Sequence, residues 1–548
     1  MKRSDRLVPA IEPRDTPRGF LVPLPIQNSI LCPDILLFVE SPMYRIAPVI
    51  ALLFAPAPAW SADFDAQPLD AVVERALTEF QVPGAAVVVV QHDKVIYLKG
   101  FGVREKGKND PVTPRTVFPI ASCTKAFTAT LVAMLVDEGK LRWDDKVRDH
   151  LEYFHLSDDL ADREVTIRDL LCHRTGMPRH DLLWSGLSTE GGDVIRRWGR
   201  ATPSTSFRSK WEYANVPFTT AGSIAGNKLN LSWADAVHQR IFTPLGMSSS
   251  SGTWKIGSGA ADRATPHYHA LDKSIAAVKW DELDHAGGAG CVNSTAADMA
   301  AWLRFQLAGG TFNEKRLVGE RALKETHTAQ MLFKPEGPFA LYFPAKAGRF
   351  HTYGLGWFVH DYRGHDCVSH GGTLTGFRAQ CMMVPEKKLG VFAVCNLRPT
   401  VFPEAVCKGV IDQLLGLPTE DWVKIGKDHL ALLDLATTAR NKKRQADRKP
   451  DTKPSLPLAS YAGSYEERAY GMLEVVLEKE RLVGKWGKFT FRLDHYHFDT
   501  FTAVPIEPAD EVISYDRSTF DVQFRLGVKG DIEGVKVFDQ EFKKGKGK

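Results

Sequence analysis

Ser122 and Lys125 are the two residues whose types and spacing most directly indicate catalysis. They stand three positions apart in the segment Phe118–Val136, and side chains at this separation share one face of a helix. A serine hydroxyl becomes an effective nucleophile when a neighbouring base takes its proton. A buried lysine can be that base, because desolvation lowers its pKa. The pair therefore predicts nucleophilic catalysis, although Ser-x-x-Lys alone also occurs by chance in a chain of this length.

The segment that follows Ser122 is predicted to be a buried helix. Its residues are apolar on nearly every side up to Val136, and Gly139 is a suitable residue to end it. Ser122 would then lie in the first turn, where the positive end of the helix favours negative charge on the serine oxygen. Cys123 faces another side of the helix, so we interpret it as part of the core.

Two further segments carry side chains suited to the same chemistry. Tyr213 and Asn215 are two residues apart, so in an extended loop both face one side. A phenol there could shuttle a proton, and an amide could bind a carbonyl group. Later in the chain, His370-Gly371-Gly372 is predicted to form a strand edge, where missing side chains let a substrate backbone approach.

Taken in this order, Ser122-x-x-Lys125, Tyr213-x-Asn215 and His370-Gly371-Gly372 resemble the serine β-lactamase and penicillin-binding-protein superfamily, specifically its class C-like branch. The resemblance extends over about Asp63 to Leu430. Four further sequence segments also resemble that branch: Trp143–Lys146, His173–Pro178, Pro244–Met247 and Ala286–Gly288. His173 is isolated from other catalytic residue types, and we interpret it as a structural, hydrogen-bonding histidine.

The resemblance implies a role for each matching residue. Ser122 would be acylated, Lys125 would activate it, and Tyr213 would protonate the leaving group and later help to activate water. Asn215 would hold the substrate amide. The backbone N–H groups of Ser122 and Thr373 would form the oxyanion hole, whose donors contribute about 3 kcal/mol each. The residues expected to bind substrate are Asn215, His370, Gly371, Gly372 and Thr373.

One position departs from the best-known family pattern. Where typical β-lactamases and transpeptidases carry Lys-Thr-Gly, this chain has His370-Gly371-Gly372. A lysine there supplies a fixed positive charge for a substrate carboxylate, whereas a histidine is mostly neutral at pH 7 unless its pKa is raised. The resemblance therefore implies a serine hydrolase of D-amino-acid peptides, amides or esters. A true β-lactamase and a penicillin-binding sensor without turnover are the alternatives.

The chain divides into a leader and two folded parts. We assign residues 1–62 to an N-terminal extension and signal peptide, 63–430 to a catalytic domain, 431–455 to a helix end and charged linker, and 456–548 to a β-barrel. The fold class is α+β, with the β-lactamase/transpeptidase-like antiparallel sheet, flanking helices and all-helical region implied by the resemblance. The polar segment Arg440–Pro454 is the predicted linker.

The C-terminal part alternates β-rich runs with turns, which predicts a small antiparallel barrel or sandwich. It resembles a lipocalin-like domain appended to some members of the superfamily. The β-rich runs are 473–477, 481–485, 489–493, 500–504, 522–526 and 534–538.

The N-terminus has the pattern of a secretory signal. Met43 opens a short basic region, an apolar run from Ile46 to Phe54, and small residues up to Ala62. We interpret Met43 as the true start, with an uncleaved apolar segment as the alternative. The apolar run is too short to span a bilayer. We therefore expect an exported protein of the bacterial periplasm or extracellular space, without a transmembrane anchor after cleavage.

Composition excludes several other classes. A net charge of +4 over 548 residues argues against a nucleic-acid partner. Loss of Cys32 with the leader leaves an odd number of cysteines, which is a poor disulfide framework. The histidine pairs at 267 and 269 and at 495 and 497 lack a completing ligand set, so we expect no metal and no cofactor. The expected partner is a small-molecule or peptide substrate, including one derived from peptidoglycan; the oligomeric state stays open.

Overall fold

The computed structural model describes residues 65–187, 190–269, 274–337, 339–344, 346–506 and 520–545. The predicted N-terminal extension, the start at Met43 and the signal peptide all lie outside these ranges. Within the described ranges, no helix combines the length and apolarity needed to cross a membrane.

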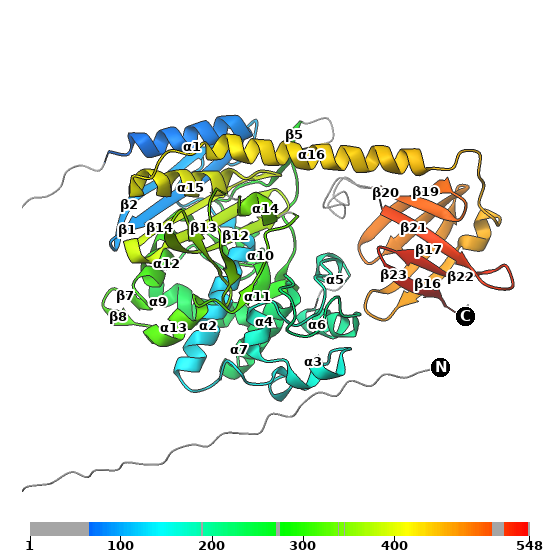
Figure 1. Cartoon of the computed structure of the whole chain (residues 1–548), viewed down its shortest axis with the longest axis horizontal. Coiled ribbons are helices and arrows are strands. Elements are labelled where there is room, and N and C mark those ends of the chain that lie inside the picture. The colour runs from blue at the N-terminus through cyan, green and yellow to red at the C-terminus, as the bar shows by residue number, and fades with distance from the viewer. Residues whose placement is uncertain are drawn as a thin grey trace, which may run out of the picture. The chain divides into compact units, whose positions relative to one another are not determined.

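An eight-stranded antiparallel sheet forms the centre of the catalytic part (Figure 1). In sheet order its strands are β2 (Lys94–Gly102), β1 (Gly84–Gln91), β14 (Leu389–Cys395), β13 (Phe377–Val384), β12 (His365–Leu374), β11 (Phe358–Tyr362), β10 (His351–Tyr353) and β9 (Met331–Leu332). Strand β1, which lies between β2 and β14, is an apolar run buried on both faces, because helices cover both sides of the sheet.

Different helices cover the two faces of the sheet. On one face, α15 (Phe402–Leu415) packs on β13 and β14, and α1 (Gln67–Phe80) packs on α15. On the other face, α12 (Ala296–Leu307) packs on β1 and β14. Each face therefore has its own apolar core, and the second core continues into the helical region that holds Ser122.

The predicted buried helix is α2 (Thr124–Asp137), and its apolar character on every side is explained by its surroundings. It packs against α7 (Val216–Leu229), α11 (Gly287–Gly290) and α13 (Glu320–Thr326). The helix ends just before Gly139, which takes a left-handed conformation with φ of 69°, as its sequence position predicts. Helix α2 is thus held from several directions at once.

The C-terminal part is a closed antiparallel barrel, as predicted, and its first and last strands pair with each other. Its strands are β16 (Gly463–Glu467), β17 (Gly471–Glu478), β18 (Arg481–Trp486), β19 (Phe489–His497), β20 (Thr500–Pro505), β21 (Phe520–Leu526), β22 (Ile532–Val537) and β23 (Gln540–Lys544). Sequence analysis found β17 to β22 but missed β16 and β23. Both are short and half polar, so they lack a strong apolar run.

The predicted linker is shorter than expected. The helix α16 (Trp422–Asp447) continues past Arg440, so the first residues of the segment assigned as linker are helical. Lysine, arginine and glutamine have good helix propensity, and a helix in solvent needs no apolar face along its whole length. The charged residues after Arg440 therefore correctly indicated exposure to solvent, but the prediction of a linker was wrong for residues 440–447, which are helical.

Candidate active site

Ser122 lies in a short 3₁₀ turn, Ala121–Cys123, that leads directly into α2. The preceding Ala121 has a left-handed backbone with φ of 50°, which is unusual for a residue with a side chain. The turn is held against strand β12 at Gly372. A Cβ atom on Gly372 would lie 2.1 Å from the carbonyl oxygen of Ile120, so only glycine permits this approach.

Lys125 is fully buried, with none of its surface exposed, and its ammonium nitrogen has three polar neighbours. Nζ lies 2.7 Å from Oδ1 of Asn215, 2.8 Å from the carbonyl oxygen of Ala289 and 3.1 Å from Oγ of Ser122. The first two neighbours can only accept hydrogen bonds. They therefore occupy two N–H groups and leave the third position of Nζ directed to the serine.

The environment of Lys125 favours the neutral amine. Burial lowers the pKa of Lys125 well below its usual value, and the positive charge of Arg179 lowers it further, with Asp181 acting in the opposite direction. In a neutral amine, the position facing Ser122 is the lone pair. The geometry and the electrostatics thus agree: this nitrogen can take the proton of the Ser122 hydroxyl.

Tyr213 and Asn215 line a pocket together with Ser122. They reach it from the segment that precedes α7, with Asn215 at the start of the helix. The Lys125 nitrogen lies 5.0 Å from the centre of the Tyr213 ring. Burial raises the pKa of Tyr213, while the Ser122 hydroxyl and the charge of Arg179 partly oppose this rise. The phenol therefore stays protonated near neutral pH and can donate a proton.

His173 lies behind Tyr213 as a structural residue. Its ring centre is 4.4 Å from that of Tyr213 and 4.7 Å from that of Tyr353, and its Nδ1 accepts a hydrogen bond from the backbone N–H of Ala214. It is fully buried, and burial lowers its pKa well below the usual value. A neutral, enclosed imidazole of this kind orients Tyr213 rather than exchanging protons with a substrate.

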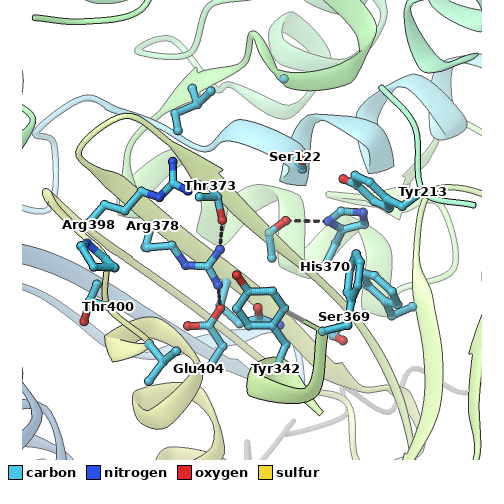
Figure 2. A pocket seen from close by; sticks show the side chains of 18 of the residues that line it. Ser122, Tyr213, Tyr342, Ser369, His370, Thr373, Arg378, Arg398, Thr400 and Glu404 are labelled. Carbon is cyan, nitrogen blue, oxygen red and sulfur yellow. Dashed lines mark hydrogen bonds and ion pairs between the residues drawn. The ribbon is translucent and has the colours of Figure 1, made fainter. Parts of the chain in front are cut away.

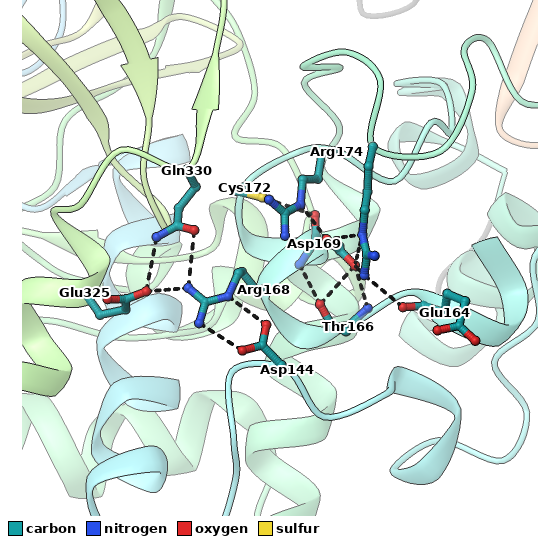
Figure 3. A network of polar contacts seen from close by, with 10 residues as sticks. Asp144, Glu164, Thr166, Arg168, Asp169, Cys172, Arg174, Glu325 and Gln330 are labelled. Atoms are coloured by element: carbon teal, nitrogen blue, oxygen red, sulfur yellow. Dashed lines mark hydrogen bonds and ion pairs between the residues drawn. The ribbon is translucent and has the colours of Figure 1, made fainter. Parts of the chain in front are cut away.

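A buried carboxylate anchors the helix that leads to His173. Asp169, in α4 (Ile167–Leu171), is fully buried and accepts hydrogen bonds from Thr166 and Arg174 (Figure 3). It also accepts a hydrogen bond from Arg208. A buried charge is tolerated only when it is paired and hydrogen-bonded, as it is here. The network therefore fixes the start of the loop that continues from His173 to the active site.

His370 forms part of the pocket wall but supplies no charge. Its Nδ1 lies 2.7 Å from the carbonyl oxygen of Gly371, which can only accept, so Nδ1 carries the hydrogen. Nε2 then accepts from the hydroxyl of Tyr353, 2.9 Å away. Burial, aided by the charge of Lys125, lowers the pKa of His370 to about 3. Both ring nitrogens are thus engaged by the protein, so any contact of His370 with substrate is through the ring surface.

The pocket has a volume of about 560 Å³ and extends beyond the predicted residues to the face of the sheet covered by α15. Figure 2 shows Arg378 between Thr373 and Glu404, with Tyr342 beside it. Burial alone would raise the pKa of Tyr342, but the charges of Arg378 and Arg398 outweigh it and lower that pKa. This half of the pocket combines aromatic rings with a buried ion pair.

Thr373 was expected in the pocket, but sequence reasoning missed Tyr342, Arg378 and Glu404, and also Arg179 and Asp181. Asp181 Oδ1 accepts a hydrogen bond of 2.9 Å from Nδ2 of Asn215, and Arg179 Nε donates to Asp181 Oδ2 over 2.5 Å. A signal was present in the sequence, because two charged residues stand within three positions after Pro178, where the Gly/Pro loop ends. Their position against Asn215 depends on the tertiary structure.

No metal site emerges in the part of the chain that the structure describes. There, His, Cys, Asp and Glu side chains do not gather in groups of three or more that could hold an ion. His267 instead places Nδ1 3.0 Å from the carbonyl oxygen of Asn396, and its Nε2 accepts from the backbone N–H of Lys106.

The buried histidines predict acid sensitivity. Burial lowers the pKa values of His173, His360 and His370 below 6.5, the ordinary value. Below pH 6.5 the unfolded chain therefore binds protons that the folded protein excludes. Each of these residues should lower the free energy of unfolding by up to about 1.4 kcal/mol for each pH unit below 6.5.

Urea denaturation at pH 7.0, 6.0 and 5.0 tests this expectation. Carboxylates with lowered pKa values, such as Asp70 and Asp421, change the free energy of unfolding only below about pH 4, so they do not affect it between pH 7.0 and 5.0. His360→Gln should reduce the dependence on pH. An unfolding free energy that is constant from pH 7.0 to 5.0 would contradict the assignment of neutral histidines.

Comparison with known families gives two matches. A family model described as Beta-lactamase matches residues 69–415, and a model described as a domain of unknown function, DUF3471, matches residues 447–547.

Among curated proteins, the unguisins hydrolase of Aspergillus violaceofuscus is 29% identical over 448 residues, covering 76% of this chain and 78% of that protein. A second unguisins hydrolase, from Aspergillus campestris, is 27% identical over 75% of this chain and 77% of its own length. Protein flp of Staphylococcus aureus is 25% identical over 62% of this chain and 64% of its own.

Solved structures share the fold. A penicillin-binding protein homologue from Pyrococcus abyssi, described as octameric, superimposes with a TM-score of 0.56 at 19% identity, covering 87% of this chain and 99% of that one. A D-amino acid amidase from Ochrobactrum anthropi SV3 superimposes with a TM-score of 0.52 at 21% identity, covering 66% of this chain and 98% of the amidase.

Proposed function

Because this chain belongs to the β-lactamase family of serine hydrolases, we propose that it cleaves D-amino-acid peptides, amides or esters through an acyl-serine intermediate. The observation that carries the proposal is the arrangement at Lys125. Its buried Nζ donates to Asn215 and Ala289 and directs its remaining position to Ser122 Oγ. This is the arrangement that a serine nucleophile needs from its base.

The proposed first half of the reaction forms the acyl-enzyme. Nζ of Lys125 accepts the hydroxyl proton as Oγ of Ser122 attacks the acyl carbon, and the carbonyl oxygen gains negative charge. The backbone N–H groups of Ser122 and Thr373 stabilise that charge. The carbon–nitrogen or carbon–oxygen bond then breaks, and Tyr213 protonates the leaving group. The proton on Lys125 restores the Tyr213 hydroxyl.

The second half releases the acyl group. A water molecule attacks the ester carbon and loses a proton to the Lys125 and Tyr213 pair. Oγ of Ser122 leaves and recovers a proton, so the enzyme returns to its starting state. The high pKa of Tyr213 supports its part in both halves, because the phenol holds its proton until a more basic group develops beside it.

The state of His370 supports the proposed substrate class. A neutral imidazole with both nitrogens engaged does not supply the fixed charge that the Lys-Thr-Gly lysine offers to a carboxylate. Within the pocket, the charge of Arg378 is paired with Glu404. The name of one similar protein, an unguisins hydrolase, agrees with hydrolysis, and the name of another, a D-amino acid amidase, agrees with an amide substrate.

Intact-mass analysis after treatment with a fluorophosphonate tests the proposal. We expect a single adduct, and peptide mapping should place it on Ser122. The same protein is then assayed with nitrocefin, p-nitrophenyl butyrate, a D-alanine p-nitroanilide and a D-Ala-D-Ala peptide. Turnover of the ester or a D-amino substrate is the expected result. Efficient nitrocefin hydrolysis would instead indicate a β-lactamase, and a stable adduct without turnover would indicate a sensor. Absence of any adduct would refute the proposal.

Export remains a proposal that rests on the sequence between Met43 and Ala62. It would place the enzyme in the periplasm or outside the cell, where peptidoglycan-derived peptides are available as substrates. N-terminal sequencing of secreted protein tests it, with processing near Ala59–Ala62 as the expected result.

A further inference from the structure

The barrel contacts a short active-site segment, residues 179–187, which follows the loop of His173. We propose that the C-terminal barrel is a positioning domain: it holds segment 179–187 so that Arg179 and Asp181 support the catalytic residues. The consequence for catalysis rests on the proposed function. The structural coupling between barrel and segment does not depend on it.

Segment 179–187 contacts Asn215 and Tyr213 directly. Asp181 Oδ1 accepts 2.9 Å hydrogen bonds from Asn215 Nδ2 and from Trp184 Nε1. The guanidinium carbon of Arg179 lies 5.2 Å from the centre of the Tyr213 ring. A shift of this segment would therefore change the position of Asn215, which holds Lys125, and the charges that act on Tyr213.

The barrel contacts His180, the residue between Arg179 and Asp181. The ring of Tyr470 stacks on the His180 ring with centres 5.2 Å apart, and its hydroxyl lies 2.5 Å from His180 Nδ1. His180 has a left-handed backbone with φ of 42°, which is costly for a residue with a side chain. Such a conformation persists only when its surroundings determine it, and Tyr470 is one of them.

A backbone contact fixes the other end of the segment. The N–H of Lys488, in the turn between β18 and β19, donates to the carbonyl oxygen of Gly186 over 3.1 Å. A Cβ atom on Gly487 would lie 2.3 Å from that oxygen, and one on Gly186 would lie 2.3 Å from the Phe489 ring. The two segments approach so closely that glycine is needed on both sides.

The packed interior of the barrel also supports a positioning role for this domain. Its interior is filled by buried side chains, among them Tyr465, Trp486, Phe491, Phe501 and Phe524. On Gly484, a Cβ atom would lie 2.2 Å from the Phe491 ring. Small barrels either fill their interior in this way or hold a ligand there. This barrel is packed, so its outer surface, including the part that meets segment 179–187, is where its function lies.

Tyr470→Phe and Tyr465→Phe form a matched pair for the test. Each removes one buried phenol oxygen from the barrel. The hydroxyl of Tyr470 meets His180, whereas that of Tyr465 donates to the carbonyl oxygen of Tyr461 inside the barrel. Gly487→Ala is the second variant, because its added methyl group meets the Gly186 carbonyl oxygen.

Hydrogen–deuterium exchange of the full chain provides a readout independent of activity. Amides of residues 180–187 should exchange at least fivefold faster in Tyr470→Phe and Gly487→Ala than in Tyr465→Phe. The rate of Ser122 acylation by a fluorophosphonate should fall about fivefold or more in the first two variants only.

Equal exchange in the three variants would overturn the proposal, and faster exchange with unchanged acylation would overturn its catalytic part. If wild type forms no adduct while exchange rises as expected, the proposed function fails and the positioning contact stands.

Discussion

Replacing Ser122 with alanine is expected to lower kcat on any substrate by about 10⁶-fold, as loss of a serine nucleophile does in other hydrolases. The substitution removes only a hydroxyl group whose neighbour is Lys125 Nζ, 3.1 Å away. The fold should therefore persist while the covalent adduct disappears. Steady-state kinetics with the best substrate of the panel, together with intact-mass analysis, measure both effects.

Ser223→Ala provides the matched control for this prediction. Ser223 lies on α7, outside the pocket, and its hydroxyl donates to the carbonyl oxygen of Thr219 over 3.0 Å. It should retain wild-type kinetics and form the adduct. An adduct that survives in Ser122→Ala would show that another residue is the nucleophile.

Replacing Lys125 with methionine is expected to slow acylation of Ser122 by about 10³- to 10⁴-fold, because the general base is lost. Lys125→Arg should be nearly as slow. A guanidinium keeps its proton at all accessible pH values, so it cannot accept the serine proton. Rates of adduct formation with a fluorophosphonate under single-turnover conditions measure the effect. Near-wild-type acylation in Lys125→Arg would exclude Lys125 as the base.

The same residue predicts the pH dependence of acylation in the wild type. Burial lowers the pKa of Lys125, and only the neutral amine accepts a proton. The rate should therefore rise with pH as Lys125 deprotonates and become constant well below 10.5, the ordinary pKa of lysine. Because burial raises the pKa of Tyr213, its phenol stays protonated and no descending limb is expected near neutrality. Lys125→Met should show no such rise.

The part of the site that could be predicted from the sequence is local. Ser122 and Lys125 are three residues apart on one helix, and Tyr213 and Asn215 are two apart in one loop, so short spacings determine which side chains face together. The apolar character of residues 124–136 likewise predicted a buried helix. In the barrel, β17 to β22 were recognisable because each strand carries its own β-rich run, and turns separate these runs.

A mostly neutral His370 was the expectation from its residue type, but the surroundings that fix its state could not be predicted. The structure shows that burial lowers its pKa, and that the Tyr353 hydroxyl and the Gly371 carbonyl oxygen engage its two ring nitrogens. The charged run after Arg440 was misassigned for a related reason. A charged segment is expected to be exposed to solvent, and both a linker and a solvent-exposed helix meet that expectation.

The sequence by itself determined the family and the two-part architecture, and it indicated Ser122 and Lys125 as the proposed nucleophile and base, since each motif consists of residue types at short separations. Only the tertiary structure decided which distant residues complete the pocket. Arg378 meets Glu404, and Tyr470 of the barrel meets His180 beside the active site. These pairs join segments 26 and 290 residues apart, and no periodic pattern relates such positions. Packing of the whole chain brings them together, because buried charges and strained backbone require partners that local sequence does not supply.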